Sequence, residues 1–422
     1  MTERPLVRLL ASSLLVTLLC GLVVPSADGQ SVDAPSRRVS LEEALELFRS
    51  NNLSLQRRRS EVEAARGQAR QAAAYDNPRM QATYEPVWRD GTQQSETYLN
   101  LSQRIALSGR RHRIEAAYQR ADAAEARLRA DSLRRAFEVA QSYVRAAATE
   151  SRFRRLRRVA DVFRQADSSF AAREAEGEAS GYAVRRVRLE RARYEQQLAA
   201  ARLDVQTTRQ QLALLILPDE AQTVGAKALP EARPPSITEA EALRAALERR
   251  PELRRWQAEV DAQQAALEAA QNASRPSPTI TAGFKHQSDG FEGLFLGAAL
   301  PLPLFNRNRG QAQAESAQLS ATQTTQMLAR REIRNDVLRA HSAYESFRQQ
   351  MRLIGENLLP GSDDLLRIAQ TSYGEGEMSL VELLDATEAY RDAQIQYIDL
   401  QTDLWIRYFD LLRATGRTIR VP

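Results

Sequence analysis

Hydrophobic and polar residues alternate with a period of two in four short stretches of the chain. In the last of these, Leu294, Leu296 and Ala298 share one face, which is the pattern of a strand with one apolar and one polar side. Asp-Gly pairs at 90–91 and 289–290 divide the stretches into two hairpins. We predict strands over about 78–87, 95–107, 277–287 and 293–304.

Most of the remaining chain has helical periodicity. No proline occurs between Gly109 and about Glu176, which predicts a helix of roughly 65 residues, about 100 Å long at about 1.5 Å per residue. Near the C-terminus apolar residues recur every seven positions, the pattern of a coiled-coil seam. They are Leu383, Tyr390, Tyr397, Leu404 and Leu411, with Ala386, Ala393 and Leu400 between them. The predicted fold class is mainly α with a small β part.

The same order of elements is predicted twice. Ser40 with Glu43 and Thr238 with Glu241 form two capping boxes 198 residues apart, and each opens a helix that stops before a proline. A hairpin, a long helix, a turn and a second long helix follow in both places. We predict one duplicated helix–hairpin–helix unit, with the first repeat at 30–236 and the second at 237–422.

Each hairpin runs directly into a long helix. In the second copy Pro301 and Pro303 end the strand pattern, and Asn306 and Gly310 belong to the turn before the helix. The first copy makes the same join at Gly109 and has no proline there. We expect the two joins to bend differently.

Four strands with one apolar face are too few to close into a barrel. A closed barrel is the only kind of β-sheet that can span a lipid bilayer, because it leaves no unpaired strand edge. Three chains would supply twelve strands for a transmembrane β-barrel, and the long helices would continue it as a helical tube, an α-barrel. The apolar face would contact lipid and the polar face water. The residues predicted on the polar face are Gln81, Thr83, Glu85, Asn100, Ser102, Thr281 and Lys285.

The N-terminus predicts export. An apolar run from Leu9 to Val24, after two arginines and before small residues, is typical of a signal peptide, which we place at 1–29. Cys20 is the only cysteine and lies in this segment, so the mature chain would contain no disulfide. It follows Leu19 rather than the small residue of a lipoprotein signal.

The charges exclude several functions. The net charge is +5, and five arginines cluster on one helix, but we interpret them as a solvated helix face and expect no nucleic-acid binding. These are Arg152, Arg154, Arg155, Arg157 and Arg158. The three histidines are scattered, and neither a phosphate loop nor a G-x-S-x-G motif occurs. We expect no enzymatic activity, no metal site and no cofactor.

Two segments resemble the TolC family of outer-membrane efflux ducts. They are ALPLPLFNRNRGQAQAES, with its twin LSQRIALSGRRHRIEAA, and YGEGEMSLVELLDATEAY. With the duplicated plan, the resemblance extends over the mature chain, and the first segment is most similar to the branch that serves heavy-metal exporters. The resemblance implies a homotrimer in outer-membrane lipid with a periplasmic extension. It would act as a passive exit duct for tripartite efflux or type I secretion, docked to a periplasmic adaptor and an inner-membrane pump.

The resemblance also implies a pore constriction lined by Tyr373, Glu382 and Asp385. The residues themselves leave two interpretations open. The two acids, three residues apart, share a helix face, where carboxylates from three chains would suit cation passage. They also fit a cap or salt bridge at the helix start, which the helix dipole favours. Met378 stands where some members of the family have a basic residue that tethers the closed tip.

Glycine and serine residues mark the tips of the two helix hairpins. We expect the glycines to permit tight turns, and the resemblance implies that the tips dock the adaptor. These residues are Gly177, Ser180 and Gly181 in the first copy and Gly374, Gly376 and Ser379 in the second.

The alternative function is that of a secreted periplasmic coiled-coil protein with a structural or adaptor role. The four alternating strands argue against it, because a coiled-coil rod has no use for them.

Overall fold

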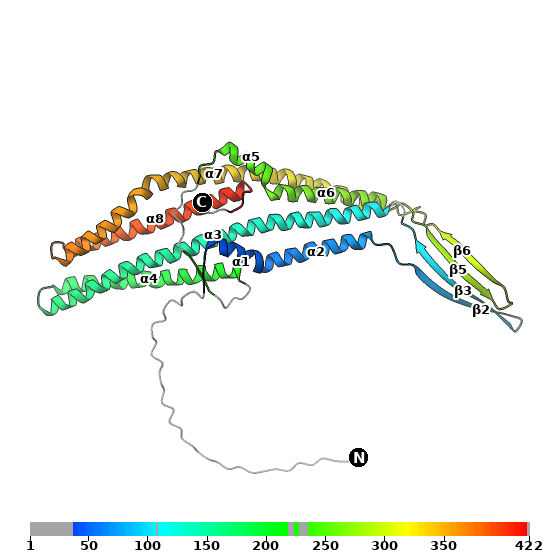
Figure 1. The fold of residues 1–422 in the computed structure, drawn as a ribbon, viewed down its shortest axis with the longest axis horizontal. Helices are drawn as coiled ribbons and strands as arrows, with labels where there is room; N and C mark the ends of the chain where they lie inside the picture. The colour runs from blue at the N-terminus through cyan, green and yellow to red at the C-terminus, as the bar shows by residue number, and fades with distance from the viewer. Residues whose placement is uncertain (1–36, 107–108, 218–222, 228–234, 420–422) are drawn as a thin grey trace, which may run out of the picture. The chain divides into compact units, whose positions relative to one another are not determined.

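Two long helix hairpins make up most of the protein (Figure 1). Its structure is a computed structural model that describes residues 37–106, 109–217, 223–227 and 235–419. In the first hairpin α3 (Gly109–Ala175) is followed by α4 (Gly181–Ile216), and in the second α7 (Arg309–Gly374) is followed by α8 (Leu380–Ala414). The helices of each hairpin pack along each other, and α3 also packs against α8. The long helices predicted from the 3.6-residue period are therefore confirmed.

Two predictions fall on parts of the chain outside the described residues. The signal peptide at 1–29, with Cys20, is one of them, and the end of the predicted strand at Leu107 is the other. Among the helices that are described, none has the length and apolar character needed to cross a membrane.

Each half begins with two short helices where the sequence predicts one. α1 (Leu41–Asn51) and α2 (Leu53–Ala73) are separated at Asn52, and α5 (Glu239–Arg249) and α6 (Pro251–Asn272) at Arg250. The Asn52 side chain accepts hydrogen bonds from two N–H groups of α2 and donates to the Leu215 carbonyl at 2.9 Å. Asn52 therefore caps a new helix at a point where the spacing of apolar residues continues without a break. The prediction of a single helix is wrong. Both capping boxes, at Ser40 and Thr238, are confirmed.

A small second sheet was not predicted from the sequence. β1 (Arg37–Val39) pairs in parallel with β4 (Val224–Ala226). The paired residues Arg37 and Val224 are 187 positions apart in the sequence. Both strands belong to the largest hydrophobic core, with the fully buried side chains of Phe48, Phe137 and Trp405. This core holds α1, α3, α4 and α8 together at mid-length of the hairpins.

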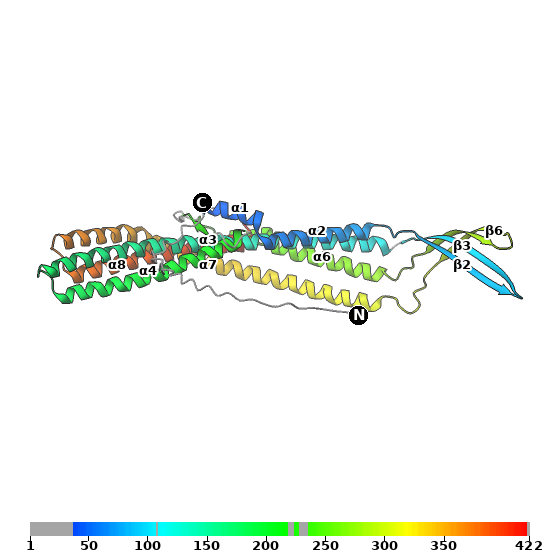
Figure 2. The ribbon, with the colours of Figure 1, turned by 90° about the horizontal axis from the view of Figure 1, so that it is seen from below.

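The four predicted strands form one antiparallel sheet, ordered β2–β3–β5–β6. Both views place it beyond the same ends of α3 and α7 (Figures 1 and 2). The bounds are β2 (Arg79–Arg89), β3 (Thr92–Arg104), β5 (Thr279–Gln287) and β6 (Glu292–Ala299). The last strand ends five residues before the predicted 304, because prolines at 301 and 303 cannot donate to a strand ladder.

The two faces of the sheet differ in polarity along its whole width. Met80, Leu101, Ala282 and Leu296 are paired in register across all four strands, and the next apolar row does the same. Leu296 is 80 % exposed in the single chain. The register places all seven residues predicted on the polar face together on the opposite side. The sheet therefore presents an uncovered apolar surface.

We predict that Gly283→Ala destabilises the sheet by about 1–3 kcal/mol, the usual cost of overpacking. A Cβ at Gly283 would lie 2.1 Å from Asn100 Oδ1 and 2.6 Å from the Leu99 carbonyl oxygen. Gly293→Ala is the matched control, because a Cβ there meets nothing within 4 Å. Denaturant unfolding of the purified variants in detergent measures the difference, and equal midpoints would contradict the close packing at Gly283.

Candidate functional site

The tips of the two helix hairpins are built in the same way. Gly177 has φ +78° and Gly376 has φ +79°, in the left-handed region that glycine adopts without steric cost. In the first tip the Glu178 N–H donates to the Arg173 carbonyl at 2.8 Å, and the second tip repeats this bond at 2.9 Å. The predicted tight turns are confirmed at these two glycines.

The other two tip glycines do not need conformational freedom. Gly181 is the first residue of α4 and Gly374 the last residue of α7, and neither has a positive φ. The prediction that they form tight turns is wrong. Periodicity alone could not locate the helix ends to within one residue.

Glu382 belongs to the cap of α8. Its carboxylate accepts hydrogen bonds from the Ser379 N–H at 2.8 Å and the Ser379 hydroxyl at 2.7 Å, and Ser379 Oγ accepts from the Glu382 N–H at 3.3 Å. The hydrogen bonds from the hydroxyl and N–H of Ser379 hold the pKa of Glu382 below its ordinary value of 4.5. Ser180 caps α4 in the first copy, where Ala183 replaces the acid. An acidic cap exists only in the second tip.

Asp385 lies one turn further along α8. Its side chain is exposed and makes no hydrogen bond or ion pair with any described residue. It is thus a free carboxylate on the helix face that it shares with Glu382. The residues described include no group of three or more His, Cys, Asp or Glu side chains that could hold a metal ion.

Tyr373 takes part in packing between the two hairpins. Its ring stacks on Phe170 of α3 with 5.8 Å between centroids, and its side chain also contacts the cluster that contains Met378 and Leu383. Burial raises the pKa of the Tyr373 hydroxyl, which has no hydrogen-bond partner among the described residues. In the single chain the structure therefore brings Tyr373 to Phe170, and its hydroxyl bonds to neither Glu382 nor Asp385.

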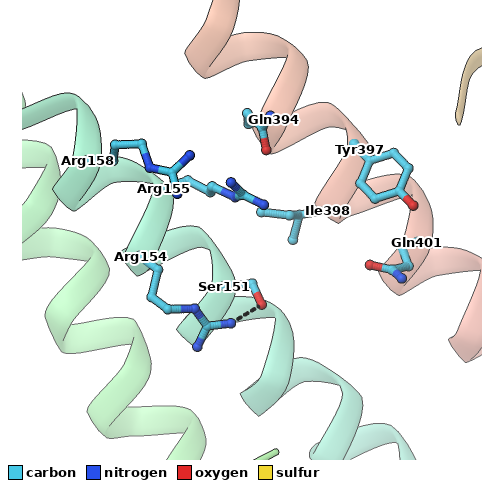
Figure 3. Close-up of a pocket in the computed structure, with 8 residues that line it drawn as sticks. All are labelled: Ser151, Arg154, Arg155, Arg158, Gln394, Tyr397, Ile398 and Gln401. Carbon is cyan, nitrogen blue, oxygen red and sulfur yellow. Dashed lines mark hydrogen bonds between the residues drawn. The ribbon is translucent and has the colours of Figure 1, made fainter. Parts of the chain in front are cut away.

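The arginine cluster at 152–158 lies beside α8. Arg152 forms an ion pair with Asp399, and Arg158 donates to the Tyr390 hydroxyl at 3.1 Å. Figure 3 shows Arg155 and Arg158 extending from α3 toward α8 across a cavity of about 260 Å³. Most of the cluster is exposed, as a solvated face requires, but two of its members also hold α3 to α8.

The strand-to-helix join of the second copy depends on a residue that sequence reasoning missed. Asn308 has φ +57° and precedes α7, and its side chain donates to the Ala270 carbonyl at 2.7 Å. Asn306 Oδ1 accepts from the Asn308 N–H at 3.0 Å, whereas Gly310 lies inside α7 without a positive φ. The sequence feature that could have identified Asn308 is an asparagine within a turn, because asparagine is one of the few residues other than glycine that readily adopt the left-handed conformation. In the first copy Gly109 is the first residue of α3.

Long paired helices, capped tips and a sheet with one polar and one apolar face together define a class of outer-membrane channel proteins. The family model described as "Outer membrane efflux protein" matches residues 44–216 and 242–417, and the chain belongs to this family. It is an efflux channel protein of the outer membrane with a periplasmic extension, so the family and location predicted from the motifs are confirmed.

Named relatives match over nearly their full length. The chain is 26% identical over 385 residues to the cobalt-zinc-cadmium resistance protein CzcC of Cupriavidus metallidurans, with 90% of each protein covered. It is 27% identical over 437 residues to the outer membrane protein OprJ of Pseudomonas aeruginosa, covering 94% of this chain and 87% of OprJ. The crystal structure of the Campylobacter jejuni CmeC outer membrane channel shares its fold, with a TM-score of 0.73, 18% identity, and 89% and 85% of the two chains covered.

We predict that Glu382→Ala destabilises the α7–α8 tip near neutral pH and has progressively less effect in acid. Because folding lowers the pKa of Glu382, its contribution is present above the unfolded pKa and is lost as the pH falls through the folded value. Thermal unfolding of variant and wild type between about pH 7 and about pH 3 measures this convergence. The matched control is Glu377→Ala, which removes an exposed tip acid outside the capping box and should leave the thermal stability at about pH 7 close to that of the wild type.

Proposed function

We propose that three copies of this chain form a continuous duct across the outer membrane and into the periplasm. The observation that supports this proposal is the sheet, whose apolar face is uncovered and whose outer strands, β2 and β6, have no neighbour on their outer side among the described residues. An apolar sheet with two open edges is unstable in water and aggregates. Lipid against the apolar face and strands of neighbouring copies against the edges remove both costs.

Closure into a barrel sets the number of copies. Four strands from each of three chains give twelve, an even number within the range of outer-membrane barrels and wide enough for a water-filled interior. The polar face, with Glu85, Asn100 and Lys285, would line that interior. The apolar rows that contain Leu101 and Leu99 would face lipid.

The long helices would continue the wall as a periplasmic tube. We propose that the chain arose as one duplicated unit, because the order of short helices, hairpin and long helix pair is the same in both halves. The tips around Gly177, Ser180 and Gly376 would dock a periplasmic adaptor that links the duct to an inner-membrane pump. The duct itself would be passive, with transport driven by the pump.

We propose that the cargo is a metal cation. Glu382 and Asp385 of α8 are exposed near the tip, and two carboxylates from each of three chains would form a negative collar that attracts cations. Capping does not conflict with this role, because Glu382 remains charged while it accepts from Ser379. The similarity to CzcC, a cobalt-zinc-cadmium resistance protein, favours this cargo.

We predict that wild-type protein in detergent has three times the mass of one chain, and that Ala298→Arg prevents this assembly while Ser102→Arg permits it. Ala298 lies on the apolar face and Ser102 on the polar face, so only the first arginine would be placed in lipid, where the cost reaches about 2–4 kcal/mol per chain at the bilayer midplane. Light scattering of the membrane extract measures the mass. A freely soluble monomer would instead support the secreted coiled-coil protein.

We predict that replacing Glu382 and Asp385 together by alanine reduces the cation selectivity of single channels in planar bilayers. The physical reason is the loss of the negative collar at the narrow tip. The reversal potential in a salt gradient measures selectivity. The control replaces Glu375 and Glu377, exposed acids on the turn itself, and an equal shift in both variants would remove Glu382 and Asp385 from the pore lining.

A further inference from the structure

A cavity of about 350 Å³ lies where the four-stranded sheet meets the helices. It is bounded by the end of β3, the start of α3, the alanine-rich end of α6 and the start of α7. Residues far apart in the sequence converge there, and five of them are arginines. These are Arg104, Arg110, Arg113, Arg120 and Arg275. The only acid in the lining is Glu315, whose carboxylate accepts from Gln311 at 2.6 Å and from Gln263.

This positive charge is not neutralised within the described part of the chain. There, four of the arginines make no ion pair or hydrogen bond through their side chains, namely Arg104, Arg113, Arg120 and Arg275. The fifth, Arg110, donates a hydrogen bond to the Ala73 carbonyl and lies 4.1 Å above the Tyr75 ring, while its Nε is buried without a hydrogen-bond acceptor. Elsewhere on the same helix, exposed arginines pair with acids one turn away, as Arg129 does with Glu125. The cavity thus has five guanidinium groups and a single carboxylate, that of Glu315, which none of them contacts.

The start of α7 adds to the positive potential. Asn308 lines the cavity, its side-chain N–H donates to the Ala270 carbonyl, and its side chain makes no capping bond to α7. The N-terminal N–H groups of this 66-residue helix therefore have no side-chain cap. A helix N-terminus carries a partial positive charge that favours anions.

The polar face of β3 and the orientation of α3 both favour a place for the cavity on the inner wall of the duct, and this inference rests on the proposed function. By strand alternation Arg104 shares the polar face of β3 with Ser102 and Asn100. On α3, Arg113 lies thirty residues before Tyr143 and Arg120 thirty residues before Glu150, and both of these later residues contact the region of the small sheet. Thirty residues of an α-helix turn through eight full turns and about 120° more, so each arginine points about 120° away from its contact residue.

Those two contact residues mark the outer face of α3. Tyr143 donates to the Lys227 carbonyl at 3.0 Å, and Glu150 lies 3.5 Å from Arg38. The layer formed by β1, β4 and α1 would obstruct a duct if it lay inside, so it belongs on the outer face. Arg113 and Arg120 are turned away from that layer.

We propose that this cavity is an anion-binding site in the duct wall, which takes small multivalent oxyanions that carry phosphate or carboxylate groups. Guanidinium groups bind such oxyanions with paired, charge-assisted hydrogen bonds. With one copy per chain, the sites form a positive ring at the level where sheet and helices join. The duct then has a negative tip, which attracts the cation cargo, and a positive outer segment, which binds anions.

The test compares two double variants of the full chain. Arg113→Gln with Arg120→Gln removes two cavity arginines and leaves Arg110, which packs on Tyr75. Arg111→Gln with Arg129→Gln is the control, because these residues lie on the opposite side of α3 and change the net charge equally.

Binding is measured by calorimetry with inorganic tripolyphosphate on detergent-solubilised protein. We expect wild type and control to bind alike, and the cavity variant to bind at least about tenfold more weakly. In bilayers the cavity variant alone should shift the reversal potential toward cations. Arg275→Gln, on a different segment, should weaken tripolyphosphate binding in the same direction.

The outcomes separate this inference from the proposed function. Equal weakening in both double variants, or no tripolyphosphate binding by wild type, overturns the anion site. Loss of co-purifying anionic phospholipid in the cavity variant, without tripolyphosphate binding, would place the arginines at the lipid surface and also overturns it. Specific binding by a protein that forms no channels supports the site and contradicts the duct.

Discussion

The pairing of β3 with β5 is the interaction on which the rest of the structure depends. It joins the first half of the chain to the second, from Glu96 opposite Gln287 to Arg104 opposite Thr279. Each hairpin alone would be marginally stable in water, whereas the joined sheet has two continuous faces of opposite polarity. Lys285 Nζ lies 2.8 Å from Glu96 Oε2 on the polar face, so an ion pair also connects the two halves. Because α3 and α7 begin just beyond this sheet, its register also sets their relative position.

The helices are held together by a few apolar clusters, and most of their charged side chains serve solubility. The main core surrounds Trp405 and Phe137, and a smaller one stacks Phe163 of α3 on Tyr194 of α4 with 4.7 Å between centroids. Many ion pairs, such as Arg129 with Glu125 and Arg367 with Asp364, lie one turn apart on exposed helix faces, where each adds little stability. The Arg209–Glu150 pair is the exception, because both side chains are buried beside the small sheet.

The structure departs from the sequence-based expectations where local hydrogen bonds or distant contacts decide. Asn52 interrupts an apolar period by capping α2, and Asn308 adopts a left-handed conformation in the turn that we assign to Asn306 and Gly310. In the coiled-coil seam of α8, Gln394 is buried where Tyr397 and Ala393 were expected to pack. Its amide donates to the Ser362 hydroxyl at 3.0 Å, a partner on α7 that no spacing along α8 reveals. Each departure is a polar group whose partner lies outside the repeating pattern.

Periodicity by itself determined which side of each strand is apolar and where the long helices run, because these properties depend on neighbours within a few residues. The capping boxes at Ser40, Thr238 and Ser379 are local in the same sense. The family resemblance came from particular sequence segments, such as the strand-to-helix join and the tip of the second helix hairpin. Only the tertiary structure decided which faces meet. It stacks Tyr373 on Phe170, pairs β1 with β4 and gathers Arg104 and Arg275 around one cavity. The physical reason is that the sequence pattern of a helix or strand specifies which of its faces is apolar and which is polar. Which other element packs against that face is decided by packing across the whole fold.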